Sequence, residues 1–261
     1  MTETTTGAVH LETDEVIATL RLARPKKMNA LTPIMLEQLA DHVRTLDHDK
    51  NIRVVLVTSD GDRAFCTGAD INAFAEHDAL GVWRDWIRNG HRAFAALAGL
   101  RQPSIAVIQG DAFGGGLELA MACDLRVGAD TARFGLPEVG IGTVPGWGGT
   151  SRLGALVGPS RAKRMVFTGE TIAAATAERW GLIDLLTSPA KLHATSRTLA
   201  KQIASRGPVA VQLAKQALDH ATHGNVEVLE ALTGALTAIT QDRAEGIAAF
   251  RERRTPQFLG L

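Results

Sequence analysis

The chain has 261 residues, of which 45% are hydrophobic and 21% are charged. This length and hydrophobic content are enough for one large domain with a smaller appendage, and they exclude an intrinsically disordered chain. Lysine plus arginine and aspartate plus glutamate each total 28, so the formal net charge is zero. A neutral chain has no global field that would attract nucleic acid or an anionic membrane surface.

The start of the chain and its cysteines bear on location. Residues 1–7 lack the basic and apolar regions of a secretory signal, and no run of about 18 apolar residues occurs anywhere. Cys66 and Cys123 do not form a CxxC pair, which is more typical of a reducing compartment than of a disulfide framework. We therefore expect a cytoplasmic protein with no membrane partner and with two buried, inert thiols.

The first predicted elements are a hairpin and a helix. Residues 9–13 and 16–22 alternate apolar with polar side chains on either side of an Asp-Glu pair, which predicts two antiparallel strands. Thr32 followed by Pro33 is an N-cap with proline at the first helical position, and apolar residues then recur at helical spacing. The sequence thus predicts a helix that packs on the sheet.

The middle of the chain repeats strand and helix patterns. Residues 52–57 and 104–108 are short, β-branched apolar runs typical of buried strands, and residues 83–100 between them predict a helix. A glycine turn follows, then a predicted helix at 117–123 and a strand at 125–127. This order predicts an α/β fold built around a mostly parallel sheet.

The pattern changes after Leu186. Ser188–Pro189 and Gly207–Pro208 are helix-start signals, and the segments that follow are rich in alanine, leucine and glutamine without strand-like runs. We therefore predict a core over residues 1–195 that carries the functional site, followed by a helical carboxy-terminal region over residues 196–261.

The most informative stretch is the glycine turn itself. Gly114, Gly115 and Gly116 run directly into Leu117 and Glu118. Glycines let the backbone turn tightly and let its N–H groups approach a ligand, because no Cβ is in the way. A helix that begins at such a turn directs free N–H groups and the positive end of its dipole at whatever lies in front of it. The turn is a candidate site for developing negative charge.

A second segment of small residues, 64–70, follows the predicted 52–57 strand and could present another backbone N–H. Two converging N–H donors would form an oxyanion hole, a site for a carbonyl oxygen that gains charge during a reaction, where each donor is worth about 3 kcal/mol. The alternative is that the two segments are unrelated tight turns.

Two other kinds of site are excluded by the sequence. Residues 142–151 lack the lysine of a phosphate-binding P-loop, and no GxSxG motif of a serine hydrolase occurs.

The chain resembles the enoyl-CoA hydratase/isomerase family, also called the crotonase superfamily, over about residues 16–258. The resemblance lies in residues 24–31, 64–71, 110–124 and 134–153, and in 167–170 with Gly181 and Leu182. It implies a crotonase-like spiral of repeated ββα units. It also implies that the helical carboxy-terminal region takes part in forming a homotrimer or a dimer of trimers.

The resemblance also assigns catalytic roles. The backbone N–H groups of Ala69 and Gly115 match the family's oxyanion hole, which binds the thioester oxygen of an acyl-CoA. Glu118 and Glu138 match the two acidic residues of the hydratase type, with Glu118 activating water and Glu138 protonating Cα. Gly146 matches a glycine whose N–H helps to place the water. Two close carboxyl groups titrate as a pair, so the sequence leaves open which one holds a proton at rest.

The substrate-binding segments follow from the same resemblance. The residues that match those holding the adenine and pantetheine parts of CoA are Lys27, Met28, Ala30, Gly68, Ala69, Asp70 and Ile71. No metal and no separate cofactor is implied, because CoA is part of the substrate. Trp147 departs from the common pattern, since it occupies a position often filled by a small residue. We expect it to line or shorten the pocket.

The resemblance implies reversible hydration of a trans-2-enoyl-CoA to a 3-hydroxyacyl-CoA, in fatty-acid or related acyl-CoA metabolism. The nearest alternative is a Δ3-Δ2-enoyl-CoA isomerase, which can work with a single acid/base, so the presence of both glutamates favours the hydratase. Other classes are a non-catalytic acyl-CoA-binding protein and an RNA-binding relative. Residues 33–48 contain one arginine and no lysine, so they lack the basic stripe that RNA binding requires.

Overall fold

The larger of two β-sheets forms the framework of the molecule. The computed structural model describes residues 6–220 and 226–261. The sheet order is β1-β2-β3-β5-β7-β10, and only the β1/β2 pair is antiparallel. The strands are β1 Ala8–Asp14, β2 Ile17–Ala23, β3 Val54–Ser59, β5 Ser104–Ile108, β7 Leu125–Ala129 and β10 Leu185–Thr187. The predicted hairpin and the mostly parallel sheet are confirmed, with β3 shifted two residues towards the carboxy terminus.

A second sheet is built from very short strands. Its order is β4-β6-β8-β9, with β4, β6 and β8 parallel and β9 antiparallel to β8. The strands are β4 Ala64–Cys66, β6 Asp111–Phe113, β8 Arg133–Gly135 and β9 Ile172–Ala173. The pairs β3/β4, β5/β6 and β7/β8 each give one strand to each sheet before a helix follows. This is the predicted spiral of ββα units, which the structure confirms.

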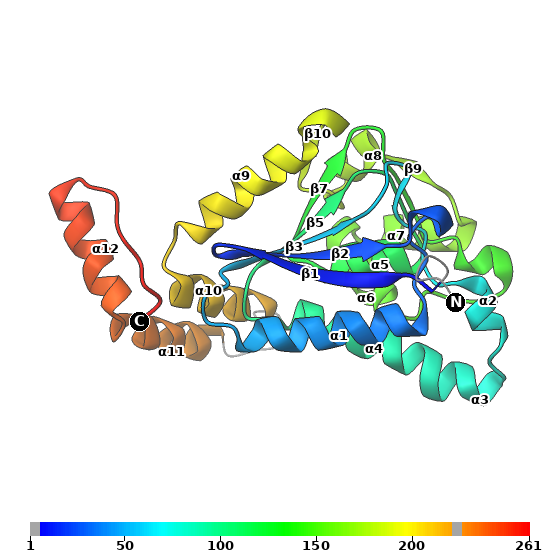
Figure 1. Ribbon diagram of the computed structural model, residues 1–261, viewed down its shortest axis with the longest axis horizontal. Coiled ribbons are helices and arrows are strands. Elements are labelled where there is room, and N and C mark those ends of the chain that lie inside the picture. Colours follow the sequence, from blue (N-terminus) through cyan, green and yellow to red (C-terminus); the bar gives the residue numbers. More distant parts are fainter. Residues whose placement is uncertain (1–5, 221–225) are drawn as a thin grey trace.

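Helices enclose the two sheets (Figure 1). The helical elements up to β10 are η1 Pro25–Lys27, α1 Pro33–His48, α2 Ile71–Ala75, α3 Ala79–Gly81, the π-helix η2 Val82–Ile87, α4 Arg88–Ala98, α5 Gly115–Ala122, η3 Glu138–Ile141, α6 Gly149–Val157, α7 Pro159–Thr168 and α8 Ala174–Arg179. Helix α1 has the predicted cap, since the Met35 N–H donates to Thr32 Oγ1. The predicted 83–100 helix starts with a π-helical turn before α4.

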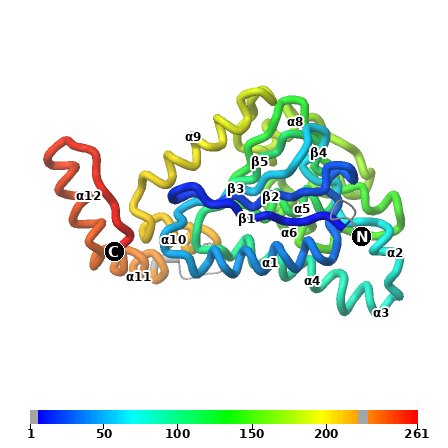
Figure 2. Tube along the Cα trace, viewed as in Figure 1, coloured from blue at the N-terminus to red at the C-terminus, as the bar shows by residue number. Residues whose placement is uncertain are grey.

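Four further helices follow β10, after the 3-10 turn η4 Pro189–Lys191. They are α9 Leu192–Ala204, α10 Pro208–His220, α11 Val226–Ala238 and α12 Gln241–Glu252. Helix α9 packs on the large sheet through Leu192 and Ala200, so the predicted boundary between residues 195 and 196 falls inside a helix that belongs to the core. Helices α11 and α12 extend away from both sheets (Figure 2). Part of the predicted helical region, residues 221–225, lies outside the described residues.

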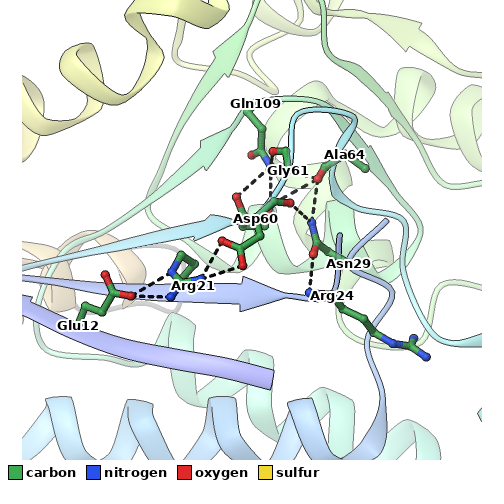
Figure 3. A network of polar contacts seen from close by, with 9 residues as sticks. Glu12, Arg21, Arg24, Asn29, Asp60, Gly61, Ala64 and Gln109 are labelled. Atoms are coloured by element: carbon green, nitrogen blue, oxygen red, sulfur yellow. Dashed lines mark hydrogen bonds and ion pairs between the residues drawn. The ribbon is translucent and has the colours of Figure 1, made fainter. Parts of the chain in front are cut away.

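A network of side-chain amides holds the turn that joins the two sheets (Figure 3). Asn29 Nδ2 donates to the carbonyl oxygens of Asp60 and Ala64 at 2.8 and 3.0 Å, while Asn29 Oδ1 accepts from the Arg24 N–H at 3.0 Å. Gln109 Nε2 donates to the Ala64 carbonyl from the next unit at 3.1 Å. Because buried carbonyls need partners, these amides fix the position of β4 relative to β2 and β5.

Helix α5 lies at the centre of the fold. Every residue from Gly115 to Ala122 is buried, including Glu118. A carboxyl group in such a helix is costly to bury unless other groups stabilise it, so Glu118 marks the place where the core is interrupted by a polar site.

Candidate active site

A cavity of about 360 Å³ opens where the segments that follow β4, β6 and β8 meet. This volume is within the range of small-molecule sites. The lining residues that matter below are Gly68 and Ala69 after β4, Gly115 and Glu118 after β6, Glu138 after β8, and Gly146 and Trp147 before α6. The ββα repeat therefore brings together three loops that are distant in the sequence.

The loops after β4 and β6 are in direct contact. Gly68 has φ +100°, and a Cβ on it would lie 3.0 Å from the Gly115 nitrogen. A Cβ on Gly116 would lie 2.0 Å from the Cys66 carbonyl oxygen. Glycine is required at both positions, because any side chain would push the two segments apart. The triple glycine thus allows α5 to begin against β4.

Two residues that line the cavity, Ala69 and Gly115, have backbone N–H groups with no protein acceptor among the described residues. Gly115 is the first residue of α5, where an N–H has no intrahelical partner. On the other loop, the Leu31 N–H donates to the Gly68 carbonyl at 2.7 Å and the Asp70 N–H donates to the Leu31 carbonyl at 2.8 Å. Within residues 6–220 and 226–261, the intervening Ala69 N–H donates to no protein atom. Both N–H groups are available to a ligand.

Glu118 is buried, and its carboxyl group accepts backbone hydrogen bonds. Its side chain is on α5 and the residue is only 2% exposed. Oε1 accepts from the Trp147 N–H at 2.8 Å and from the Gly149 N–H at 2.7 Å. The pKa of Glu118 is raised overall, because burial outweighs these N–H groups and the Arg152 guanidinium, which lower it. The loop before α6 therefore holds the charged form in place.

Glu138 is in a different environment at the start of η3. Its Oε2 atom is buried and has no hydrogen-bond partner among the described residues. Burial, together with the negative charge of Glu118, raises the pKa of Glu138 to about 7. Burial disfavours the charged form of this carboxyl group, so Glu138 can hold or release a proton near neutral pH.

Gly146 lies beside Glu118, because its backbone is close enough to lower the pKa of that carboxyl group. A Cβ at this position would lie 2.4 Å from Ile87 Cδ1 of the π-helix. The backbone thus approaches the opposite wall of the cavity as closely as glycine allows.

A model of the family described as "Enoyl-CoA hydratase/isomerase" matches residues 12–260. The chain belongs to this family. A crotonyl-CoA hydratase of Syntrophomonas wolfei is 38% identical over 252 residues, which cover 95% of this chain and 96% of the relative. A short-chain-enoyl-CoA hydratase of Clostridium acetobutylicum is 36% identical, with 94% of this chain and 95% of the relative covered.

Solved structures agree with the family membership. A crystal structure titled enoyl-CoA hydratase from Bacillus anthracis has a TM-score of 0.93 and 35% identity to this chain. The match covers 97% of this chain and 99% of that one. The family resemblance predicted from the sequence is confirmed, and the crotonase fold with it.

The residues expected to hold CoA in this enoyl-CoA hydratase/isomerase family member are divided between the cavity and its rim. Gly68, Ala69 and Ile71 line the cavity, whereas the expected residues that do not line it are Lys27, Met28, Ala30 and Asp70. The first segment is joined to the rim, because the Thr67 N–H donates to the Met28 carbonyl at 3.1 Å. Asp70 caps α2 and pairs with Arg24 Nη1 at 2.5 Å.

Sequence reasoning missed the residues that hold Glu118. The Trp147 and Gly149 N–H groups bind its carboxylate, and Arg152 Nη1 donates to the Trp147 carbonyl at 3.1 Å. The only signal was the glycine-rich run 145–149, in which a backbone can approach another group closely. The run by itself does not indicate that the group approached is the Glu118 carboxylate.

Among the described residues, no group of three or more histidine, cysteine, aspartate or glutamate side chains could hold a metal ion. No helix in the described ranges is long and apolar enough to cross a membrane. Cys66 and Cys123 are free and buried as predicted, and burial raises the pKa of each thiol to about 12.

Proposed function

We propose that this protein is an enoyl-CoA hydratase, which adds water reversibly to a trans-2-enoyl-CoA and gives a 3-hydroxyacyl-CoA. The observation that carries the proposal is the pair of carboxyl groups in one cavity, one held by N–H donors and the other with its buried Oε2 atom unpartnered among the described residues. Such a pair can act as general base and general acid in the same turnover.

The thioester oxygen is proposed to accept hydrogen bonds from the Ala69 and Gly115 N–H groups. Addition of water at Cβ moves negative charge onto this oxygen, giving an enolate. Two fixed N–H donors and the amino-terminal end of α5 stabilise that charge without having to reorganise. The buried position of α5 strengthens the interaction because water is excluded.

Glu118 and Glu138 are proposed to handle the two protons. The Glu118 carboxylate accepts a proton from water while the oxygen of that water bonds to Cβ, with Gly146 helping to place the water. Glu138 donates its proton to Cα as the enolate collapses. Each turnover leaves Glu118 protonated and Glu138 charged, and exchange with solvent restores the starting state. The reverse sequence is dehydration.

The chemistry requires no metal and no redox cofactor in this proposal, since hydration leaves the overall oxidation state unchanged and CoA is part of the substrate. We also propose a cytoplasmic location in acyl-CoA metabolism, which the two free, separated cysteines support. A homotrimer or a dimer of trimers is proposed as the assembly. Supporting it, α11 and α12 extend from the core with exposed apolar side chains.

Loss of crotonyl-CoA absorbance on hydration tests the function. We expect Glu118→Gln and Glu138→Gln each to lower kcat by about 100-fold to 10,000-fold, the usual contribution of general acid-base catalysis. Glu37→Gln on the exposed face of α1 is the matched control, and we expect it to leave kcat unchanged. Full activity in both active-site variants would refute the mechanism.

The same preparation separates the alternatives. Isomerisation of a 3-enoyl-CoA is measured alongside hydration, and an isomerase would retain activity in Glu118→Gln while the unaltered protein hydrates nothing. A non-catalytic acyl-CoA-binding protein would bind the thioester in calorimetry without turnover. Either result would replace the hydratase proposal.

A further inference from the structure

We propose that Trp147 sets the acyl chain length, by closing the end of the cavity that receives the substituent on Cβ. The protein would then act on short, unbranched 2-enoyl groups of about crotonyl size. This inference rests on the proposed hydratase function and concerns only which acyl groups that function accepts.

The position of Trp147 relative to Glu118 is the first argument. The Trp147 N–H donates to Glu118 Oε1 at 2.8 Å, so the residue that carries the indole also fixes the proposed base. Water activated by Glu118 must reach Cβ. The substituent on Cβ therefore starts beside Trp147, and the indole lines the cavity at this point.

The fit of the indole is the second argument. A Cβ on Gly115 would lie 2.6 Å from Trp147 Cε3, and a Cβ on Gly90 would lie 2.2 Å from Trp147 Nε1. The ring thus fills the space between α4 and the start of α5, and glycine at both neighbouring positions leaves it that space. No room remains behind the ring for a longer acyl chain.

The indole is also fixed in place. Trp147 is 3% exposed, and its ring centroid lies 5.3 Å from that of Phe94 in an edge-on contact and 5.6 Å from that of Trp86. Its Nε1–H donates to the Trp86 carbonyl at 3.3 Å. Swinging the ring aside would break these contacts and leave a buried N–H unpaired, so a longer substrate cannot displace it easily.

The other direction for an acyl chain is the exposed rim, where Ile141 and Val144 are 61% and 64% exposed. That rim continues from η3, which carries Glu138, the proposed acid at Cα. Glu118, the proposed base at Cβ, is at the buried floor next to Trp147. The chain beyond Cβ therefore points to the floor, where Trp86 and Ile87 extend the wall.

The test is kcat/KM for straight trans-2-enoyl-CoA substrates from four to ten carbons. A pocket contact typically discriminates by about 10-fold to 200-fold per methylene. We expect the unaltered protein to lose at least about tenfold in kcat/KM between four and eight carbons. The ratio of eight-carbon to four-carbon activity should rise in the order Trp, Phe, Ala at position 147, by about tenfold or more in Trp147→Ala.

The control is Trp83→Ala on the neighbouring π-helix, since Trp83 is 60% exposed and does not line the cavity. We expect its chain-length profile to match that of the unaltered protein. If Trp147→Ala does not fold, the inference is still tested by the milder Trp147→Phe variant and by the chain-length profile of the unaltered protein. A flat profile across chain lengths, or an unchanged ratio in a folded Trp147 variant, would overturn the inference. A protein that hydrates no enoyl-CoA would instead refute the proposed function.

Discussion

Two glutamates with the same chemistry differ here because of their neighbours. Glu118 accepts two backbone N–H groups, whereas Glu138 Oε2 has no partner in the described part of the chain. Donors stabilise a carboxylate, and burial without donors favours the neutral acid. Burial and hydrogen bonding thus give two residues of the same type different environments, which is the basis for proposing one as base and the other as acid.

The pH dependence of hydration follows from Glu138. Its pKa is about 7, so the carboxyl group is protonated below this pH and charged above it. Because hydration uses the protonated acid, kcat/KM for hydration should fall as pH rises through about 7, approaching tenfold per pH unit. A pH profile with crotonyl-CoA measures this. Constant kcat/KM up to pH 9 would contradict the assignment of Glu138 as the acid.

Arg152 should change the pKa of Glu118, the proposed base, through its charge. Its charge lowers the pKa of Glu118, so Arg152→Gln should raise that pKa and leave less carboxylate at low pH. We expect kcat/KM at pH 6 to fall by roughly threefold to tenfold, with a smaller loss at pH 8. Arg164→Gln, in α7 and paired with Glu170, is the control. An equal loss at both pH values would instead indicate structural damage.

At the scale of elements, glycines decide how closely α5 approaches β4. A Cβ on Gly116 would lie 2.0 Å from the Cys66 carbonyl, which is backbone and cannot move aside. We expect Gly116→Ala to lower the free energy of unfolding by about 2 kcal/mol or more, measured by urea denaturation. An unchanged free energy would show that the two segments can separate without cost.

Gly154 provides the matched comparison within a helix. It lies inside α6, and a Cβ there would meet no atom within 4 Å. Gly154→Ala should therefore raise the free energy of unfolding by up to ~1 kcal/mol, because alanine is the better helix former. Opposite signs for the two substitutions are the expected result. If both substitutions lowered the free energy of unfolding, α6 would need glycine at position 154 for a reason other than contact with neighbouring atoms.

At the scale of the whole molecule, α11 and α12 are short of contacts. Ile239 and Phe250 are 82% and 85% exposed on this projecting part of the chain. Such apolar surface is typical of a face covered by another subunit. It is the basis for expecting an oligomer rather than an isolated chain.

Sedimentation measures the assembly directly. We expect a species of about three or six times the 27.8 kDa chain mass. Ile239→Glu and Phe250→Glu should shift it towards the monomer, because a charge cannot be buried there without a partner. Leu80→Glu is the control, because Leu80 is 52% exposed and lies on α3 at the opposite end of the molecule (Figure 1). A monomeric unaltered protein would contradict the proposed trimer.

Predictability from sequence varied with the length of each element. The hairpin, α1 and β5 have clear periodicity or caps, and each was predicted. The strands of the second sheet have two or three residues each, too few for a periodic pattern, so the sequence shows β4 only as part of a segment of small residues. They form because neighbouring units place them side by side.

The sequence by itself determined the local geometry and the family. Thr32–Pro33 specifies where α1 begins, the triple glycine specifies a turn into α5, and the ordered motifs identify enoyl-CoA hydratase/isomerase. These depend on residues that are close in the chain. Only the tertiary structure decided that the Trp147 and Gly149 N–H groups hold Glu118 and that Glu138 Oε2 has no partner in the described part of the chain. A pKa depends on groups nearby in space, and folding brings those groups together from separate units.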